Sequence, residues 1–263
     1  MKKIAKTAII EDGAIIEDGV EICDFAFVGK GVKLSKGVKV FQGAQIRGDT
    51  TVGENCQIHS YAVVGNFPQD VSYKGVCGEL IIGKNNVIRE YVTINLPTLK
   101  QDKKTILGDN NYIMAYCHIA HDCVIGNNVI MANAATLAGH VEIGDFTVIG
   151  GLTPIHQFVK IGESVMLGGA SAVSQDIPHF CLAEGNRAKI KGLNLIGLRR
   201  RFDRKDIDAL KKAYTIIFRS DKPLKEAVSQ VIQEIQNDKV EQFCNFILET
   251  KRGIPYDRKK KEN

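Results

Sequence analysis

The sequence predicts a β-solenoid followed by a small α-helical domain. An aliphatic residue recurs at every sixth position through most of the first part of the chain, glycine often follows it, and helical patterning replaces the repeat after Pro178. A period of six fits neither an α-helix nor a simple two-sided strand. It fits a coil in which each repeat supplies one short strand and one corner. We therefore expect β structure over residues 1–178 and helices over residues 179–263.

The repeat occurs in three runs. The first has eleven positions from Ile4 to Val64, the second has three from Ile82 to Ile94, and the third has twelve from Leu107 to Val173. Every position is Ile, Val or Leu except Met131, and we expect these side chains to point inward and stack. Glycine is expected to permit tight corners where it follows the aliphatic residue, at positions 29, 53, 65, 83, 108, 126, 144, 150, 162 and 168.

Two interruptions of the repeat predict external loops, at about residues 66–81 and 95–106, because the repeat resumes after each of them. The first loop contains Gln69 and Asp70, and the second contains Pro97 and a lysine-rich run. Long loops on a regular scaffold are often functional, and we expect these two to be.

Helical patterning follows Pro178. Asp203 is placed to cap a helix with apolar positions at Ile207 and Leu210, and Asp221 is placed to cap another. Helices are therefore expected at about 193–201, after Asp203, after Asp221 and at about 239–250.

Composition indicates a protein of the cytoplasm. The seven cysteines are odd in number and form no C-x-x-C pair, and no signal peptide precedes the repeat, which favours free thiols in a reducing compartment. No apolar run is long enough to span a membrane. The net charge of +5 suits anionic partners such as nucleotide phosphates or an acidic carrier protein, although a solvated basic surface explains it equally well. Part of that charge lies in the tail Arg258–Lys261, which we expect to be a disordered end.

The repeats resemble those of the hexapeptide-repeat family over about residues 1–178. The resemblance implies a left-handed parallel β-helix of triangular cross-section, in which three repeats make one coil, and a homotrimer. Residues 18 apart in the sequence then stack directly, about 4.8 Å from one another.

Counting in steps of 18 brings four of the six histidines onto one ridge. His121, Gly139 and Gln157 share one column, so that residues far apart in the sequence lie within about 10 Å of one another. The other polar residues of the ridge are His118, Asp122, His140 and His156.

Three interpretations of this ridge are open. A histidine oriented by Asp122 could act as a general base, with the Gly139 N–H as donor to a developing oxyanion. Clustered histidines could instead bind zinc, or the ridge could be a polar corner without chemistry. Acyl transfer is favoured, because neither Gly139 nor Gln157 is a metal ligand of choice, and no metal is expected.

The local motifs also resemble the UDP-N-acetylglucosamine acyltransferase family, over nearly the whole chain. The motifs that carry this resemblance are His118–Cys123, Ala135–His140, His156–Phe158, Gly168–Ser171, Gln175–Pro178, Ala183–Asn186 and Gly197–Arg201. The resemblance implies transfer of an (R)-3-hydroxyacyl group from acyl carrier protein to the 3-position of UDP-N-acetylglucosamine, the first step of lipid A biosynthesis. It implies no cofactor, no nucleic acid partner and no membrane span.

The resemblance also implies the role of each site residue. His121 matches the general base, with Asp122 beside it, and the Gly139 N–H matches the oxyanion donor. The residues that match substrate-binding positions are His118, His140, His156 and Gln157 for the sugar nucleotide and acyl group, Gln69 and Asp70 for the glucosamine, and Asn194, Arg200 and Arg201 for uridine and phosphate. Gly169 matches the position that leaves room for the end of a long acyl chain.

The acceptor and the donor are each open to a second interpretation. Asn95 and Leu96 stand where family members often have histidine and arginine, and Ser72 stands where a lysine is common. Some members acylate a 3-amino analogue of the sugar and form an amide, which would still need His121. The chain could also be a coenzyme A-dependent acetyltransferase, a zinc-binding or structural β-helix, or a related glucosamine N-acyltransferase, which has an additional N-terminal domain.

Overall fold

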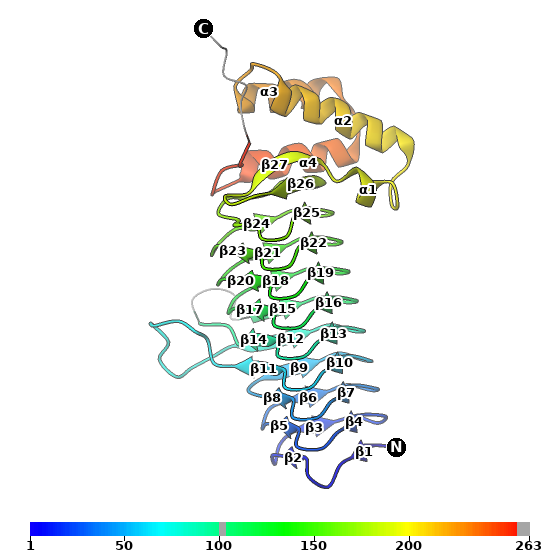
Figure 1. Ribbon diagram of the computed structural model, residues 1–263, viewed down its shortest axis with the longest axis vertical. Helices are drawn as coiled ribbons and strands as arrows, with labels where there is room; N and C mark the ends of the chain where they lie inside the picture. Colours follow the sequence, from blue (N-terminus) through cyan, green and yellow to red (C-terminus); the bar gives the residue numbers. More distant parts are fainter. Residues whose placement is uncertain (100–103, 257–263) are drawn as a thin grey trace.

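The computed structural model describes residues 1–99 and 104–256 of the chain. It is a tall column of stacked coils with a group of helices at its C-terminal end (Figure 1). Part of the lysine-rich run of the second loop and the whole basic tail lie outside the described residues. No described helix has the length and apolar character needed to cross a membrane.

Three parallel sheets form the three faces of a left-handed β-helix, as the repeat predicts. The first face contains, in spatial order, β1 (Lys3–Ile4), β4 (Glu21–Ile22), β7 (Lys39–Val40), β10 (Gln57–Ile58), β13 (Val87–Ile88), β16 (Tyr112–Ile113), β19 (Ile130–Met131), β22 (Val148–Ile149) and β25 (Met166–Leu167). The second contains β2 (Ile9–Ile10), β5 (Phe27–Val28), β8 (Gln45–Ile46), β11 (Val63–Asn66), β14 (Thr93–Asn95), β17 (His118–Ile119), β20 (Thr136–Leu137) and β23 (Pro154–Ile155). The third contains β3 (Ile15–Ile16), β6 (Lys33–Leu34), β9 (Thr50–Val52), β12 (Glu79–Ile82), β15 (Lys104–Leu107), β18 (Val124–Ile125), β21 (Glu142–Ile143) and β24 (Lys160–Ile161).

The register repeats every 18 residues wherever no loop intervenes. Ile4 pairs with Ile22, and Ile119 pairs with Leu137. Across the two interruptions, Val64 pairs with Ile94 and Ile94 pairs with Ile119. The chain therefore leaves the β-helix after β11 and after β14 and returns without breaking the second sheet.

Each repeat buries two side chains rather than one. The repeat aliphatic residue is buried from Ile22 onward, and the residue two positions before it is buried as well, as at Ala26, Ala44 and Ala62. This second column holds small or short side chains, which fit the narrow interior where three faces meet. The six-residue count identified only the larger member of each pair.

The expected role of the repeat glycines is wrong. Of those named above, only Gly65 has a positive φ, of 78°. The left-handed corner instead falls three residues after the aliphatic position, where non-glycine residues such as Asp122 and His140 occupy it. The repeat glycines are needed because successive coils approach closely there: a Cβ on Gly150 would lie 2.4 Å from the Gly169 nitrogen.

A β-hairpin caps the last coil, where only helices were expected. β26 (Cys181–Glu184) extends the first sheet in parallel with β25, and β27 (Lys189–Leu193) pairs antiparallel with β26. The six-residue period has already ended at Val173, so it carries no signal for these strands.

Four helices follow the hairpin within residues 194–256: α1 (Leu195–Leu198), α2 (Arg204–Arg219), α3 (Leu224–Glu234) and α4 (Asp238–Glu249). Asp203 caps α2 as predicted, because its side chain accepts the N–H of Asp206 at 2.8 Å. The predicted cap of α3 is wrong, since Pro223 and not Asp221 occupies that position, without a side-chain bond.

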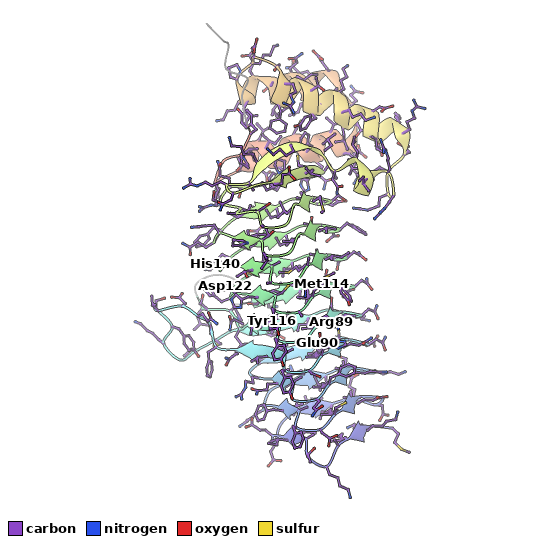
Figure 2. All side chains as sticks on the ribbon, viewed as in Figure 1. Arg89, Glu90, Met114, Tyr116, Asp122 and His140 are labelled. Carbon is purple, nitrogen blue, oxygen red and sulfur yellow. The ribbon has the colours of Figure 1, made fainter. Side chains whose placement is uncertain are left out.

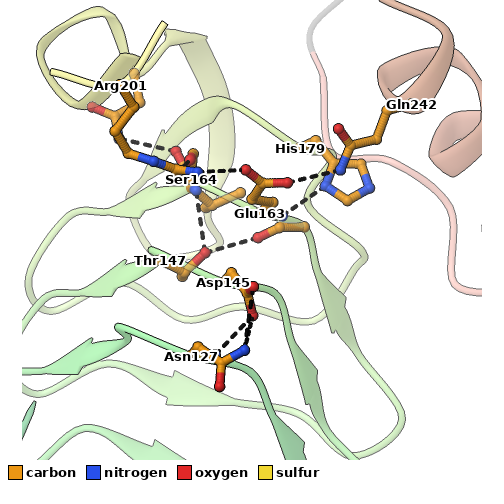
Figure 3. A network of polar contacts seen from close by, with 11 residues as sticks. Asn127, Asp145, Thr147, Glu163, Ser164, His179, Arg201 and Gln242 are labelled. Atoms are coloured by element: carbon orange, nitrogen blue, oxygen red, sulfur yellow. Dashed lines mark hydrogen bonds and ion pairs between the residues drawn. The ribbon is translucent and has the colours of Figure 1, made fainter. Parts of the chain in front are cut away.

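Glu163 joins the helices to the top of the β-helix (Figure 3). Its two carboxylate oxygens accept hydrogen bonds from Arg201 at 2.7 Å and from Gln242 in α4 at 2.9 Å. Its backbone N–H donates to Nδ1 of His179 at 2.7 Å. Asp176 makes a second junction, where it accepts the Thr250 hydroxyl at 2.6 Å.

Candidate active site

The histidine ridge lies along the corner that follows β17, β20 and β23. These strands pair in register, so the residues after them stack from coil to coil. The His140 N–H donates to the His121 carbonyl at 3.1 Å, and the Phe158 N–H donates to the Gly139 carbonyl at 3.1 Å. The columns counted in steps of 18 are therefore present in the structure.

His121 and Asp122 form a buried pair. Nδ1 of His121 lies 2.7 Å from Oδ2 of Asp122, which fixes the imidazole through that nitrogen. The same carboxylate oxygen accepts two hydrogen bonds from Thr98. Burial alone would raise the pKa of Asp122, but the hydrogen bonds from His121 and Thr98 outweigh it and hold that pKa below its usual value. Asp122 is thus an ionised acceptor at neutral pH.

His140 completes a compact group one coil above Asp122 (Figure 2). Its Nε2 lies 3.8 Å from Oδ2 of Asp122. Its ring meets the His121 ring edge to face, with centroids 5.1 Å apart, and stacks on Phe158 at 4.5 Å. Aromatic contacts on two sides hold this imidazole in place.

Gly139 lies directly against the His121 ring. A Cβ at Gly139 would be 2.5 Å from Cε1 and 2.7 Å from Nε2 of His121, so any side chain here would displace the ring. The Gly139 N–H has no backbone acceptor among the described residues.

The equivalent N–H groups at another corner are satisfied by side chains. There Lys84, Asp109 and Asn127 each donate to an Asp or Asn oxygen on the next coil at 2.7 Å. Since no such cap is found at Gly139 within the described ranges, its N–H is available to a bound molecule.

A cavity of about 650 Å³ opens beside this ridge. The predicted residues that line it are Gln69, His118, His121, Gly139, His156 and Gln157. Nδ1 of His118 lies 2.7 Å from the Thr93 hydroxyl, and burial, followed by the nearby His121, lowers the pKa of His118. His156 is held by a contact of 3.2 Å between its Nδ1 and the Gln157 carbonyl. His118 is therefore a neutral hydrogen-bonding group at physiological pH.

Several predicted residues lie away from this cavity. Asp70 is close in the sequence to Gln69, but its carboxylate accepts from the Ser72 N–H and hydroxyl, both at 2.8 Å. Asn194 caps α1 and donates to the Ser164 carbonyl. Arg201 pairs with Glu163, and its guanidinium lies 3.3 Å from the centroid of the Phe146 ring. Arg200 is exposed beside it.

Gly169 lies at a different corner of the triangle, after β25 rather than after β20. A Cβ there would meet the carbonyl oxygen and the nitrogen of Gly151 at ordinary contact distances of 3.4 Å and 3.8 Å. Its neighbour Gly168 is constrained, because a Cβ would be 2.8 Å from Cβ of Glu184. The β-helix therefore requires glycine at position 168 but does not require it at position 169.

Four further residues that line the cavity were not predicted from the sequence. Thr136 in β20 and Pro154 in β23 pair in register with His118, one and two coils above it, where counting by 18 from His118 finds them. Asn186 and Arg187 come from the turn between β26 and β27, which no repeat period reaches.

One group in the described chain could hold a metal ion. His121, Asp122 and His140 each offer a ligand atom within 4.8 Å of the others. The same three residues could instead form a general base with its orienting carboxylate, and the contact of 2.7 Å between His121 and Asp122 already has that geometry.

Comparison with known proteins gives consistent matches. Residues 176–255 match the family described as "Udp N-acetylglucosamine O-acyltransferase; Domain 2", and residues 104–139 match "Bacterial transferase hexapeptide (six repeats)". The chain is 55% identical to the acyl-[acyl-carrier-protein]–UDP-N-acetylglucosamine O-acyltransferase of Campylobacter concisus, over 97% of this chain and 98% of that protein. It is 48% identical to the protein of the same name from Helicobacter pylori, over 97% and 95%.

Solved structures show the same relationship. The UDP-N-acetylglucosamine acyltransferase from Campylobacter jejuni is 56% identical and superposes with a TM-score of 0.93, over 97% of this chain and 100% of that one. The Arabidopsis enzyme of this name is 36% identical, with a TM-score of 0.86 over 96% and 99%. This chain thus shares one fold along its whole length with enzymes of distant organisms.

Proposed function

Because this chain belongs to the UDP-N-acetylglucosamine O-acyltransferase family, we propose that it transfers an (R)-3-hydroxyacyl group from acyl carrier protein to the 3-hydroxyl of UDP-N-acetylglucosamine. This reaction is the first step of lipid A biosynthesis. The observation that carries the proposal is the buried contact of 2.7 Å between His121 and Asp122, with the ring against Gly139. That arrangement suits a general base beside an oxyanion donor.

The reaction proceeds by direct attack on the thioester. Nε2 of His121 takes the proton of the sugar hydroxyl while that oxygen attacks the thioester carbonyl carbon. The Gly139 N–H donates to the oxyanion that forms. When the tetrahedral intermediate collapses, the C–S bond breaks and His121 returns the proton to the departing thiolate of the carrier protein. Asp122 stabilises the imidazolium between these two steps.

The polar walls of the cavity orient the substrates. His118, His156 and Gln157 lie along the cavity beside His121, where they can bind the sugar nucleotide and the acyl group. Gln69 reaches the same cavity from the first loop, where it can bind the glucosamine. Asp70, which the family resemblance assigns to the same sugar, lies beside Gln69 in the sequence but outside this cavity. His140, expected to bind substrate, does not line the cavity and instead contacts Asp122 and His121.

The working enzyme is a homotrimer in the cytoplasm. Asn194, Arg200 and Gly169 do not line the cavity that contains His121 in the same chain. A neighbouring copy would bring uridine- and phosphate-binding residues, and room for the acyl chain, to each cavity. The seven unpaired cysteine thiols support a reducing compartment.

Catalysis uses no metal or other cofactor. Oδ2 of Asp122 already accepts three hydrogen bonds, from His121 and from the two donors of Thr98, which leaves it poorly placed as a metal ligand. Purified protein should hold far less than one zinc ion per chain, and activity should survive chelation. Tightly bound zinc near one ion per chain would favour a zinc-binding protein instead.

His121→Ala tests the assignment of the base. We expect kcat to fall by at least about 100-fold with the trimer intact, because general-base catalysis contributes about that much. Mass spectrometry should detect an O-acylated product from acyl carrier thioester and UDP-N-acetylglucosamine, and no product from acetyl-coenzyme A. A parallel reaction with the 3-amino sugar nucleotide shows whether an amide forms faster than the ester.

His59→Ala is a matched control, because His59 stacks on Phe41 at another corner and lies outside the cavity. It should turn over like the unmodified enzyme. Turnover of His121→Ala at the rate of His59→Ala would rule out His121 as the base.

A further inference from the structure

The second loop begins at the catalytic pair. Thr98 is 4% exposed and packs against Asp122. Its hydroxyl donates to Oδ2 of Asp122 at 2.8 Å, and its backbone N–H donates to the same oxygen at 3.1 Å. That oxygen is the one that Nδ1 of His121 contacts at 2.7 Å.

We propose that Thr98 is a positioning residue for acyl transfer, which orients the Asp122 carboxylate so that it holds His121 ready to accept a proton at Nε2. The proposal rests on the assignment of His121 as the base. Thr98 acts through Asp122 and need not contact either substrate.

The Asp122 carboxylate needs this support because only one of its two oxygens, Oδ2, accepts hydrogen bonds from the described residues. Oδ1 of Asp122 is buried and accepts no hydrogen bond from the described residues. The backbone is fixed from the other end of the loop, where the Asp122 N–H donates to the Thr105 hydroxyl at 2.9 Å. The direction of the carboxylate plane is therefore determined by the donors on Oδ2.

Loss of the Thr98 hydroxyl removes one of the two shortest of these contacts. His121 and the more distant His140 would then be the side-chain groups left near Oδ2 within the described chain. A carboxylate held by fewer donors can rotate, and a small misplacement of a catalytic group can slow a reaction about 100-fold.

A second role for Thr98 must be separated from this one. Thr98 could simply fix the loop to the β-helix, in which case its loss would lower stability and leave the pH dependence of turnover unchanged. Under our proposal the pH dependence moves, since the Thr98 hydrogen bonds help to keep the pKa of Asp122 low. Without the hydroxyl, Asp122 takes up a proton at higher pH, so activity is lost earlier as the pH falls.

The experiment compares Thr98→Val, Thr98→Ser and a control, Thr147→Val. Thr147 is also buried, and its hydroxyl donates to the Gly162 carbonyl at 2.8 Å, but it lies outside the cavity. All three are assayed in the assembled enzyme, well below the melting temperature of each variant. The proton resonance of His121 Nδ1–H is recorded by NMR in the same samples, as a signature that does not depend on turnover.

We expect Thr98→Val to lower kcat by about 10-fold to 100-fold with KM within about 2-fold, because an orienting hydrogen bond is lost. The acidic limb of the pH–kcat profile of Thr98→Val should move to higher pH. The Nδ1–H resonance of His121 should shift, or its proton should exchange faster with water. Thr98→Ser should restore all three, and Thr147→Val should change none of them.

Thr98→Val with unchanged kcat, pH profile and resonance would overturn the proposal, as would equal losses in Thr98→Val and Thr98→Ser. If the unmodified enzyme transfers no acyl group, the proposed function fails instead. In that case the NMR comparison still decides whether Thr98 orients the pair.

Discussion

At the residue scale, the site depends on a few close contacts around the His121 ring. His121 lies between Asp122 and Gly139, with Nδ1 2.7 Å from the carboxylate and the ring in the space that a side chain at position 139 would occupy. Asp122 and His140 occupy left-handed corner positions, with φ values of 59° and 61°. Polar side chains of this kind tolerate that conformation better than β-branched ones do.

Gly139→Ala tests this close approach. The added methyl group would lie 2.5 Å from His121, so we expect the ring to move and kcat to fall by about 100-fold, in line with the cost of a displaced catalytic group. Gly192→Ala is the control, because a Cβ at Gly192 meets no atom within 4 Å. Steady-state kinetics of the two variants make the comparison, and equal kcat values would contradict the predicted clash.

At the element scale, the junction between the β-helix and the helices depends on a neutral histidine. His179 packs edge to face against Phe246 of α4, with centroids 4.9 Å apart, and its Nδ1 accepts the Glu163 N–H. Burial lowers the pKa of His179 to about 4 from 6.5, the neighbouring Glu163 opposes that shift, and Lys239 adds to it. Protonation would remove the acceptor and place a charge among aromatic rings.

The pH dependence of stability follows from that shift. Between pH 6.5 and about 4 the unfolded chain binds a proton at His179 that the folded chain does not. The stabilisation is therefore complete above pH 6.5 and is lost as the pH falls toward 4, by at most about 3 kcal/mol. Denaturant unfolding of the unmodified protein and of His179→Gln, at several pH values, should give a flatter dependence for the variant. If the free energy of unfolding changed with pH equally in both proteins, His179 would not be the source of the pH dependence.

The elements also show where periodicity is a reliable guide. Two-residue strands such as β17 and β20 were predicted because each buries one aliphatic side chain at a fixed interval. The hairpin of β26 and β27 was missed because its strands lie beyond the repeat. The cap of α3 was assigned wrongly because Asp221 and Pro223 are both common helix-start residues, and backbone geometry at the helix start selects between them.

At the scale of the whole molecule, one chain does not gather all the predicted site residues. Gln69 and His121 share a cavity, whereas Asn194 and Arg200 lie at the helical end and Gly169 lies at another corner. A closed trimer would place the same surface of each copy beside a different surface of its neighbour. The proposed active site then lies between copies.

Subunit complementation tests this arrangement. His121→Ala and Arg200→Ala should each be nearly inactive alone. In trimers assembled from an equal mixture, roughly a quarter of the sites combine an intact His121 with an intact Arg200 from the neighbour, and activity should return to about that level. A mixture no more active than its components would show that both residues act from the same chain.

The sequence by itself determined the repeat architecture and the histidine ridge, because a regular coil converts a fixed interval into a contact. His121, Gly139 and Gln157 follow from counting, as does the proximity of Asp122 to His140. Only the tertiary structure decided what departs from that interval. It brought Thr98 from a loop onto Asp122, added Asn186 and Arg187 to the cavity, and placed Arg201 against Glu163. Loops and chain ends have no sequence period. Their contacts depend on three-dimensional packing, which counting residues along the repeat does not reveal.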